Sequence, residues 1–328
     1  MPRTLKQLPI FPTTVVGSFE KPDYLLKAVR NHRKGLITAE ELKKVRLKAL
    51  QDIIQLQEEV GLDILVDGEV EREEMTIFFA EKFNGLESSG WVRSYGNRYY
   101  RKPIITGPVR WPGPMTVDFF QEAQRLTDKP VKGMFTGPYT MVDWSFDEYY
   151  RDRKNAVLDF AKQYRLEAEA LQKAGCQLLQ IDEPAASVRV DEWDLFCEGL
   201  EIITKGLGIY TICHICYGEF EQVPDFNKIP VDNLDLECAN NRFNFLKEGR
   251  PFCQDISAGV FDVHTHKQTS KEELVQNIKN VLKFFPPEKV WIDPDCGLRT
   301  RAIEEARSQL KIMVEAAKEM RQELGAVS

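Results

Sequence analysis

The sequence predicts an α/β protein built as a single TIM (β/α)8 barrel, in one domain over residues 1–328, with a hairpin-like insertion after the second strand. Three observations lead to this prediction. Short apolar runs alternate with amphipathic segments along the chain, a glycine-containing junction recurs between them, and one segment interrupts the pattern. Barrels of α/β units commonly reach this length as one domain, so 328 residues do not require a second one.

Eight short runs rich in Val, Ile and Leu have the composition of strands that are buried on both faces. They lie at 13–17, 63–67, 131–136, 177–181, 209–215, 233–236, 256–263 and 290–293. Helical patterns cover 40–60, 153–174, 272–285 and 301–324. Thr38 and Glu41 form a capping box before the first of these helices. The crossovers are long enough for helices, so the strands run parallel, and eight of them favour a closed barrel.

The recurring junction lies at 58–67, 172–182 and 205–212. In each copy a helix ends at a glycine suited to a left-handed cap, and an apolar strand begins almost at once. An open, doubly wound sheet is the structural alternative, but no glycine-rich phosphate fingerprint follows the first strand. The segment at about 85–114 carries aromatic and basic residues and predicts the hairpin insertion.

Composition excludes several classes of partner. The 44 basic and 51 acidic residues give a formal charge of −7 without a block of like charge, which argues against nucleic acid and anionic membrane. No apolar run approaches the ~18 residues of a membrane span, and the N-terminus lacks a signal peptide's apolar stretch, so we expect a cytoplasmic protein. The seven cysteines, an odd number, argue against a disulfide framework; we expect Cys176, Cys197 and Cys253 to be small core residues.

Unusual polar residues collect at the expected carboxyl ends of the strands. In a barrel all eight of these ends converge on one face, where active sites form. Three of the four histidines (His214, His264 and His266) lie there. The residues that we select from these ends are Gly17, Ser18, Glu69, Asp182, His214, Cys216, Glu237, His264 and Cys296.

The His214-x-Cys216 pair indicates a metal site. Residues i and i+2 of a strand share a face, so both side chains can point at one ion. Imidazole with thiolate favours zinc over magnesium or calcium, and Cys296 and Glu237 can complete a tetrahedral set. Cys213 and Cys238 alternate to the opposite face and are expected in the core.

Four further residues have a functional and a structural interpretation. Glu69 and Asp182 are candidates to bind a substrate ammonium, or they are carboxylates at the barrel mouth that pair with an arginine. Trp144 either stacks on a planar ligand or packs at the start of a helix. His264 is either structural or a general acid, since an imidazole with a pKa of about 6.5 carries a proton near neutrality.

Long motifs in order resemble the catalytic, C-terminal barrel of the cobalamin-independent methionine synthase family. They are TTVVGSF (13–19), DGEVER (67–72), SYGNR (94–98), KGMFTGP (132–138), QIDEPA (180–185), HICYGEF (214–220) and PDCGLRTR (294–301). The resemblance implies zinc ligands at His214, Cys216, Glu237 and Cys296, and homocysteine contacts at Val16, Gly17, Ser18, Glu69 and Asp182. It also implies folate contacts at Arg98 and Trp144 and a proton donor at His264.

The implied activity is zinc-dependent transfer of a methyl group to the sulfur of L-homocysteine, which forms methionine. Two departures bear on the methyl donor: only a short leader precedes residue 13, where full-length members carry a second barrel, and Tyr99 stands where the family usually has Cys. We therefore expect a methylcorrinoid, either methylcobalamin or a methylated corrinoid protein, ahead of 5-methyltetrahydrofolate.

Two other functions remain open. The first is a related zinc-thiolate methyl- or alkyltransferase with a different thiol acceptor, although Glu69 and Asp182 would then have no amino group to bind. The second is a non-catalytic zinc-containing subunit, for example one that docks a methyl carrier. A zinc closed by four protein ligands would favour this second function.

Overall fold

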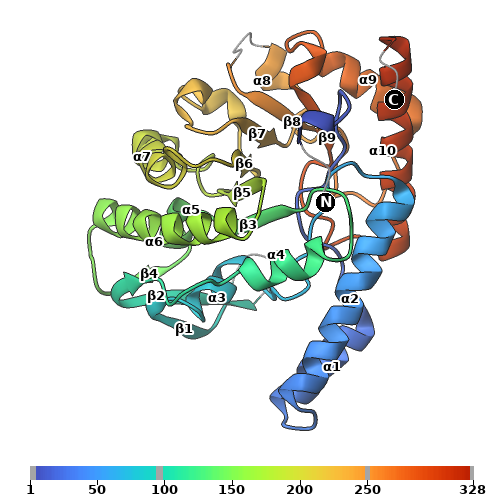
Figure 1. Ribbon diagram of the computed structural model, residues 1–328. Helices are drawn as coiled ribbons and strands as arrows, with labels where there is room; N and C mark the ends of the chain where they lie inside the picture. Colours follow the sequence, from blue (N-terminus) through green and yellow to red (C-terminus); the bar gives the residue numbers. More distant parts are fainter. Residues whose placement is uncertain (1–4, 94–98, 248–251, 326–328) are drawn as a thin grey trace.

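The computed structural model describes residues 5–93, 99–247 and 252–325 (Figure 1). Its helices are α1 (Asp23–Arg33), α2 (Ala39–Val60), α3 (Met75–Ala80), α4 (Val117–Gln124), α5 (Pro138–Asp143), α6 (Arg153–Lys173), α7 (Trp193–Thr204), α8 (Asn244–Lys247), α9 (Lys271–Val281) and α10 (Ile303–Glu323). Its strands are β1 (Asn84–Arg93), β2 (Tyr99–Arg110), β3 (Lys132–Thr136), β4 (Phe146–Asp147), β5 (Leu178–Asp182), β6 (Tyr210–Ile215), β7 (Asn233–Leu236), β8 (Asp255–Gly259) and β9 (Val290–Asp293).

The central sheet is parallel and has the strand order β3-β5-β6-β7-β8-β9. Each neighbour in this order is the next long strand along the chain, and helices such as α6, α7 and α9 lie outside the strands (Figure 1). The parallel strands, joined by connections that contain helices, confirm the predicted α/β fold class.

The first two expected strands are reduced to single bridges. Thr13 bridges to Ile292 of β9, and Leu65 bridges to Val131 beside β3. The backbone nitrogen of Thr13 donates to the carboxylate of Asp63 at 2.9 Å, so a side chain takes a bond that a strand ladder would use. The carbonyl of Thr13 in turn accepts from the backbone of Asp63 and Ile64 at 3.0 Å. These two segments therefore link the edge strands β9 and β3 without forming full strands.

The ends of α2 follow the predicted signals. The backbone nitrogen of Glu41 donates to the Thr38 hydroxyl at 3.1 Å, and that of Thr38 donates to the Glu41 carboxylate at 2.8 Å, which is the predicted capping box. The helix ends at Gly61, whose φ of +88° is the left-handed cap expected from the recurring junction.

An apolar cluster of Ile64, Leu178, Ile212 and Trp291 lies inside the sheet, and the Trp291 ring stacks on Tyr210 at 5.2 Å. Because side chains alternate along a strand, the residues two and four positions after Leu178 and Ile212 face the same interior. This alternation carries polar side chains inward at the carboxyl ends of β5 and β6.

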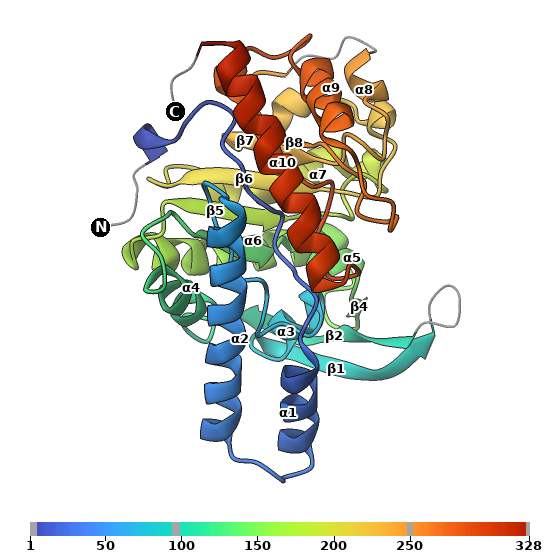
Figure 2. The same ribbon diagram turned by 90° about the vertical axis from the view of Figure 1, so that its right-hand side faces the viewer.

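Two features project from the central layer (Figure 2). One is the predicted hairpin insertion, in which β1 and β2 pair antiparallel and β4 adds to β2 in parallel. At its base Gly85 has a φ of +88°, and a Cβ there would lie 2.4 Å from the carbonyl oxygen of Pro108. The other is α1, which lies side by side with the outer part of α2 (Figure 2).

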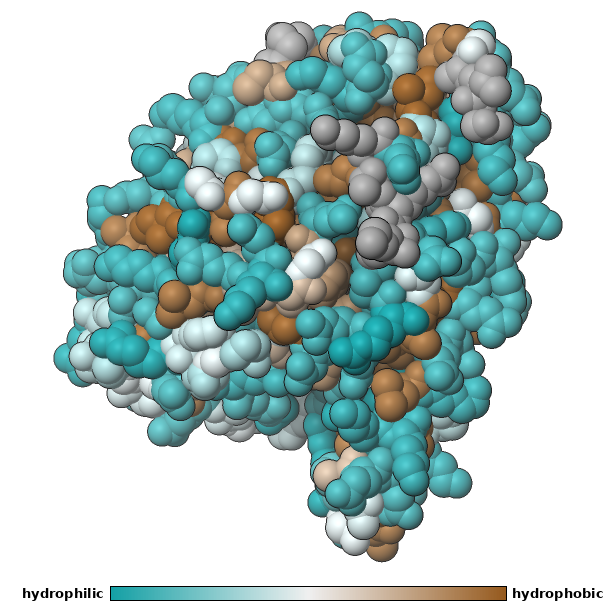
Figure 3. Space-filling view, viewed as in Figure 1, coloured by the Kyte–Doolittle hydropathy of each residue, from teal (hydrophilic) through white to brown (hydrophobic). Residues whose placement is uncertain are grey.

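The face of the molecule seen in Figure 3 is mostly hydrophilic, with small apolar patches between polar residues. None of the helices in the described ranges is long and apolar enough to cross a membrane.

Candidate metal and substrate site

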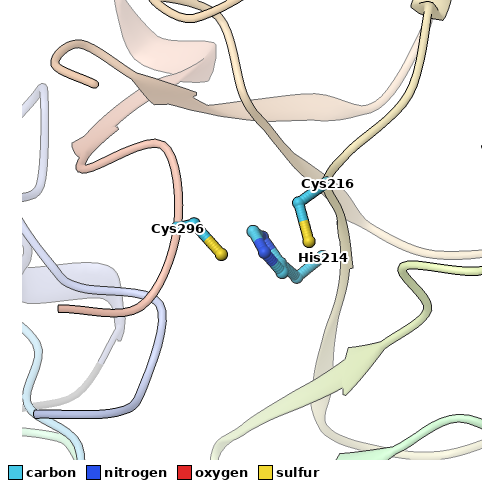
Figure 4. A group of neighbouring side chains, drawn as sticks. All are labelled: His214, Cys216 and Cys296. Carbon is cyan, nitrogen blue, oxygen red and sulfur yellow. The ribbon is translucent and has the colours of Figure 1, made fainter. Parts of the chain in front are cut away.

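Three side chains converge inside the carboxyl-terminal end of the sheet. His214 lies on β6, and Cys216 is the first residue after the end of that strand. Cys296 comes from the loop after β9 (Figure 4). One nitrogen of His214 and the two sulfurs all lie within 4.8 Å of one another. His214 and Cys216 are each 3% exposed, so water screens this group poorly. The structure thus brings together three of the four residues predicted to bind zinc.

Asp235 of β7 orients His214. Its Oδ1 accepts a hydrogen bond from His214 Nδ1 at 2.9 Å. The other ring nitrogen, Nε2, is buried and has no hydrogen-bond partner among the described residues. Burial disfavours the imidazolium, but the nearby Asp235 carboxylate raises the pKa of His214 well above its usual value. A carboxylate that fixes one nitrogen and leaves the other free is the usual arrangement around a metal-binding histidine.

The two thiols differ in acidity. The Cys216 thiol and the His214 ring stabilise the Cys296 thiolate and lower the pKa of Cys296 to about 5, against the effect of burial. The same contact with Cys296 and burial raise the pKa of Cys216. One thiolate is therefore present near neutral pH, and a metal ion would displace the proton from the second. Two sulfurs and an imidazole form a donor set that suits zinc.

Glu237, the fourth predicted ligand, lies beside this group but is not one of the three. Its Oε2 accepts a hydrogen bond from the backbone nitrogen of Tyr217 at 3.0 Å, and its Oε1 is 3.2 Å from His264 Nε2. Tyr217 has a φ of +61°, an unfavourable conformation for a residue other than glycine. This backbone turn directs its N–H at the carboxylate, so Glu237 is held close to Cys216 by two neighbours.

His264 is half-buried and contacts the Tyr217 ring, with centroids 5.3 Å apart. Its hydrogen bond with Glu237 raises the pKa of His264, although partial burial works in the opposite direction. His264 therefore lies against Glu237 and is partly open to solvent. His266 lies apart from it, in an exposed pair with Glu305 at 3.0 Å.

The segment Val16-Gly17-Ser18 adjoins both the Cys296 loop and the acidic residue Glu69. The Val16 carbonyl accepts from Gln180 Nε2 at 2.8 Å, and the Ser18 carbonyl accepts from the backbone of Leu298 at 2.7 Å, two residues after Cys296. A Cβ on Gly17 would lie 2.8 Å from Glu69 Oε1, so a larger residue here would displace that carboxylate from its present position. The predicted substrate residues therefore come from distant parts of the sequence to one place.

Glu69 and Asp182 form an acidic pair at this place. Burial raises the pKa of Glu69 to about 7, with Arg72 opposing the shift and Asp182 adding to it. Burial also raises the pKa of Asp182. Among the described residues, Arg72 forms no ion pair with either carboxylate and donates instead to the Met134 carbonyl. Two buried carboxylates with no salt bridge of their own among the described residues suit an ammonium ligand.

The residues predicted to bind the methyl donor are less well placed. Arg98 lies outside the described residues. Trp144 is the C-cap of α5, not the start of a helix, and packs partly buried against the core. No hydrogen bond or ring contact joins Trp144 to the metal group within the described ranges.

The other cysteines are free. Cys213 and Cys238 are fully buried in the core, and Cys176 and Cys197 are buried as expected. The expectation for Cys253 was wrong, because it is exposed and its backbone bonds to Asn227 in a loop.

Sequence reasoning missed Asp235, Lys132 and Gln180, which contact the site from inside the sheet. The signal for Asp235 was present, since Asp235 lies on β7 two residues before Glu237, which directly follows that strand, and alternation puts both side chains on the same side. Nothing in the composition of the β3 and β5 runs indicated that Lys132 and Gln180 face each other.

The fold and the site together define a TIM-barrel-like α/β protein with a buried imidazole–thiol group at the carboxyl ends of its strands. The model for the family "cobalamin-independent synthase, catalytic domain" matches residues 11–319. The chain therefore belongs to the cobalamin-independent methionine synthase family, whose members are S-methyltransferases.

Two methionine synthases match this chain along nearly its whole length. The methionine synthase of Saccharolobus solfataricus is 40% identical, and the match covers 98% of each chain. The methionine synthase of Sulfurisphaera tokodaii is 36% identical over 98% of this chain and 95% of the relative. Among solved structures, a B12-independent methionine synthase from Shewanella sp. W3-18-1 in complex with selenomethionine has a TM-score of 0.85 and 27% identity, covering 97% and 100% of the two chains.

These comparisons correct one expectation. The matched family is described as cobalamin-independent, so a methylcorrinoid donor is not supported.

Proposed function

We propose that this protein is a zinc-dependent methionine synthase that transfers a methyl group from 5-methyltetrahydrofolate to the sulfur of L-homocysteine. The observation that carries the proposal is the buried group of His214, Cys216 and Cys296, with an unpartnered imidazole nitrogen, beside the acidic pair. The family assignment supports methionine formation, and the description of the family as cobalamin-independent favours a folate donor over a corrinoid.

His214, Cys216 and Cys296 would hold the zinc ion, and Glu237 is placed to join them after a small movement of its side chain. Zinc supplies the Lewis acidity that keeps a thiol deprotonated near neutral pH. Two cysteine thiolates leave the centre electron-rich, which favours a nucleophilic sulfur.

Glu69 and Asp182 would bind the homocysteine ammonium, and the backbone around Ser18 would bind its carboxylate. Both anchors adjoin the metal group, because Ser18 contacts the Cys296 loop and Gln180 joins Asp182 to Val16. Fixing both ends of the amino acid orients the sulfur for in-line attack.

In the transfer, the homocysteine sulfur uses an electron pair to form the S–CH3 bond, and the bond from the methyl carbon to N5 of the folate breaks. The electron pair of that bond stays on N5, which takes up a proton. His264 would deliver this proton, since its ring reaches both Glu237 and solvent. Trp144 and Arg98 are proposed contacts of the donor.

The test is methionine formation by the zinc-loaded protein with homocysteine and either polyglutamylated 5-methyltetrahydrofolate or methylcobalamin. We expect turnover with the folate and its loss in Cys296→Ser. A protein that turns over only with methylcobalamin would overturn the donor assignment, and one inactive with both donors would overturn the proposed activity.

A different thiol acceptor is the remaining alternative enzyme activity. It is distinguished by 4-mercaptobutyrate, which is homocysteine without its amino group. Because of the acidic pair, we expect this compound to bind more weakly than homocysteine.

A further inference from the structure

A layer of polar side chains lies inside the sheet between the apolar cluster and the metal group. TIM-barrel interiors are usually filled by branched apolar residues, so a polar layer requires an explanation. All of its members are at most 2% exposed; they are Lys132, Gln180, Asn233, Asp235, Ser257 and Asp293.

Lys132 and Gln180 are the two members that face the acidic pair. Gln180 is two residues before Asp182 on β5, so both side chains point inward from one strand. Lys132 lies on the neighbouring strand β3, and its Nζ donates a hydrogen bond to Gln180 Oε1. The amine donates an N–H in either protonation state, so this contact does not depend on its charge.

The amide of Gln180 then serves two acceptors. Its Nε2 donates to Asp182 Oδ1 at 2.7 Å and to the Val16 carbonyl at 2.8 Å. Both partners are acceptors only, so the NH2 side of the amide must face them, and Lys132 is the donor that the opposite oxygen needs. Without Lys132 the Gln180 oxygen would lose this donor, and the amide would lose one of the three contacts that oppose a flip of its oxygen towards the Asp182 carboxylate.

The Lys132 side chain also stands among carboxylates. Burial lowers the pKa of Lys132, while Asp235, Asp293 and Asp182 raise it. Asp235 is the partner of His214, so the lysine lies between the metal side and the substrate side of the site.

We propose that Lys132 and Gln180 are a positioning pair for the amino-acid substrate: Lys132 helps to fix the orientation of the Gln180 amide, and Gln180 ties Asp182 to the Val16 backbone and so holds this carboxylate where it binds the substrate ammonium. This inference rests on the proposed homocysteine site and adds two residues that touch neither substrate nor metal. It predicts that their loss affects recognition of the ammonium and not of the thiol.

The experiment compares the affinities of the zinc-loaded protein for homocysteine and for 4-mercaptobutyrate by calorimetry. The ratio of the affinity for homocysteine to the affinity for 4-mercaptobutyrate measures recognition of the ammonium group alone, because both ligands carry the same thiol and the same carboxylate. The variants are Lys132→Met, Gln180→Met and the double variant. Gln254→Met is the control: Gln254 is also a buried glutamine, but it bonds to the Phe226 and Ile229 carbonyls.

We expect each single variant to lower the ratio roughly fivefold to tenfold, the effect of losing about one net hydrogen bond. Because the pair acts as one unit, the double variant should lower it no further than either single variant. The zinc content of every variant should equal that of the wild type. The control variant Gln254→Met should also keep the wild-type affinity ratio.

The outcomes separate the two proposals. A wild-type ratio near one would contradict the ammonium site itself and so the proposed function. A high wild-type ratio that Lys132→Met and Gln180→Met leave unchanged would overturn the positioning pair alone. If Lys132→Met does not fold, Gln180→Met, which keeps the lysine, decides the question.

Discussion

Asp235 offers a direct way to weaken the proposed zinc site without changing a proposed ligand. Its carboxylate is 2.9 Å from His214 Nδ1, and the side chains of the two residues are 1% and 3% exposed. Loss of such a partner lowers metal affinity roughly 10–100-fold, or about 1.4–2.8 kcal/mol. Asp235→Asn keeps an acceptor but removes the charge, so we expect the lower end of this range. Asp235→Leu removes both and should reach the upper end.

Zinc affinity would be measured by competition with a chromophoric chelator on the purified protein. The matched control is Asp255→Asn, an aspartate on the neighbouring strand β8 that bonds to the Tyr210 hydroxyl at 2.6 Å. It should leave zinc affinity unchanged. If Asp235→Leu binds zinc as tightly as the wild type, Asp235 does not orient the His214 ring through Nδ1. The proposal that His214 Nε2 binds zinc in that orientation would then be refuted.

Three further predictions concern the substrate side and the supporting loops. Asp182→Asn should weaken homocysteine binding by about 1.5–3 kcal/mol, the value of a charge-assisted hydrogen bond, in a calorimetric titration; unchanged affinity would place the ammonium elsewhere. The pKa of Glu69 is raised to about 7, so its carboxylate is lost as the pH falls through 7, and the preference for homocysteine over 4-mercaptobutyrate should fall with it. A Glu69→Gln protein should show no such step. Gly259→Ala would place a Cβ 2.2 Å from Asp295 Oδ1, next to Cys296, and should destabilise the fold by about 1–3 kcal/mol in urea unfolding. Gly90→Ala, where nothing lies within 4 Å, is its control, and equal stabilities would contradict the steric argument.

Local patterns predicted most of the fold. The six strands of the central parallel sheet and the capping box at Thr38 follow from composition and spacing that act over a few residues. The first two strands were overestimated, since the Asp63 side chain takes the backbone hydrogen bond of Thr13. That competition depends on a contact between residues 50 positions apart, which periodicity does not reveal.

The sequence likewise predicted part of the candidate site. Alternation on β6 and the convergence of strand ends predict that His214, Cys216 and Cys296 meet. The position of Glu237, engaged by Tyr217 and His264, depends on a left-handed backbone turn at Tyr217 that no sequence signal marks. Likewise, the pairing of Lys132 with Gln180 follows from the register between two strands and not from either strand alone.

The sulfur count at the metal tests the central claim most directly. X-ray absorption at the zinc edge would be recorded for the zinc-loaded protein before and after addition of homocysteine, with 4-mercaptobutyrate as the reference thiol. Zinc–sulfur bonds have a length of about 2.3 Å, well separated from those to nitrogen and oxygen. We predict two sulfurs, from Cys216 and Cys296, in the free enzyme and three with homocysteine. A count that stays at two would contradict binding of the homocysteine sulfur to the metal.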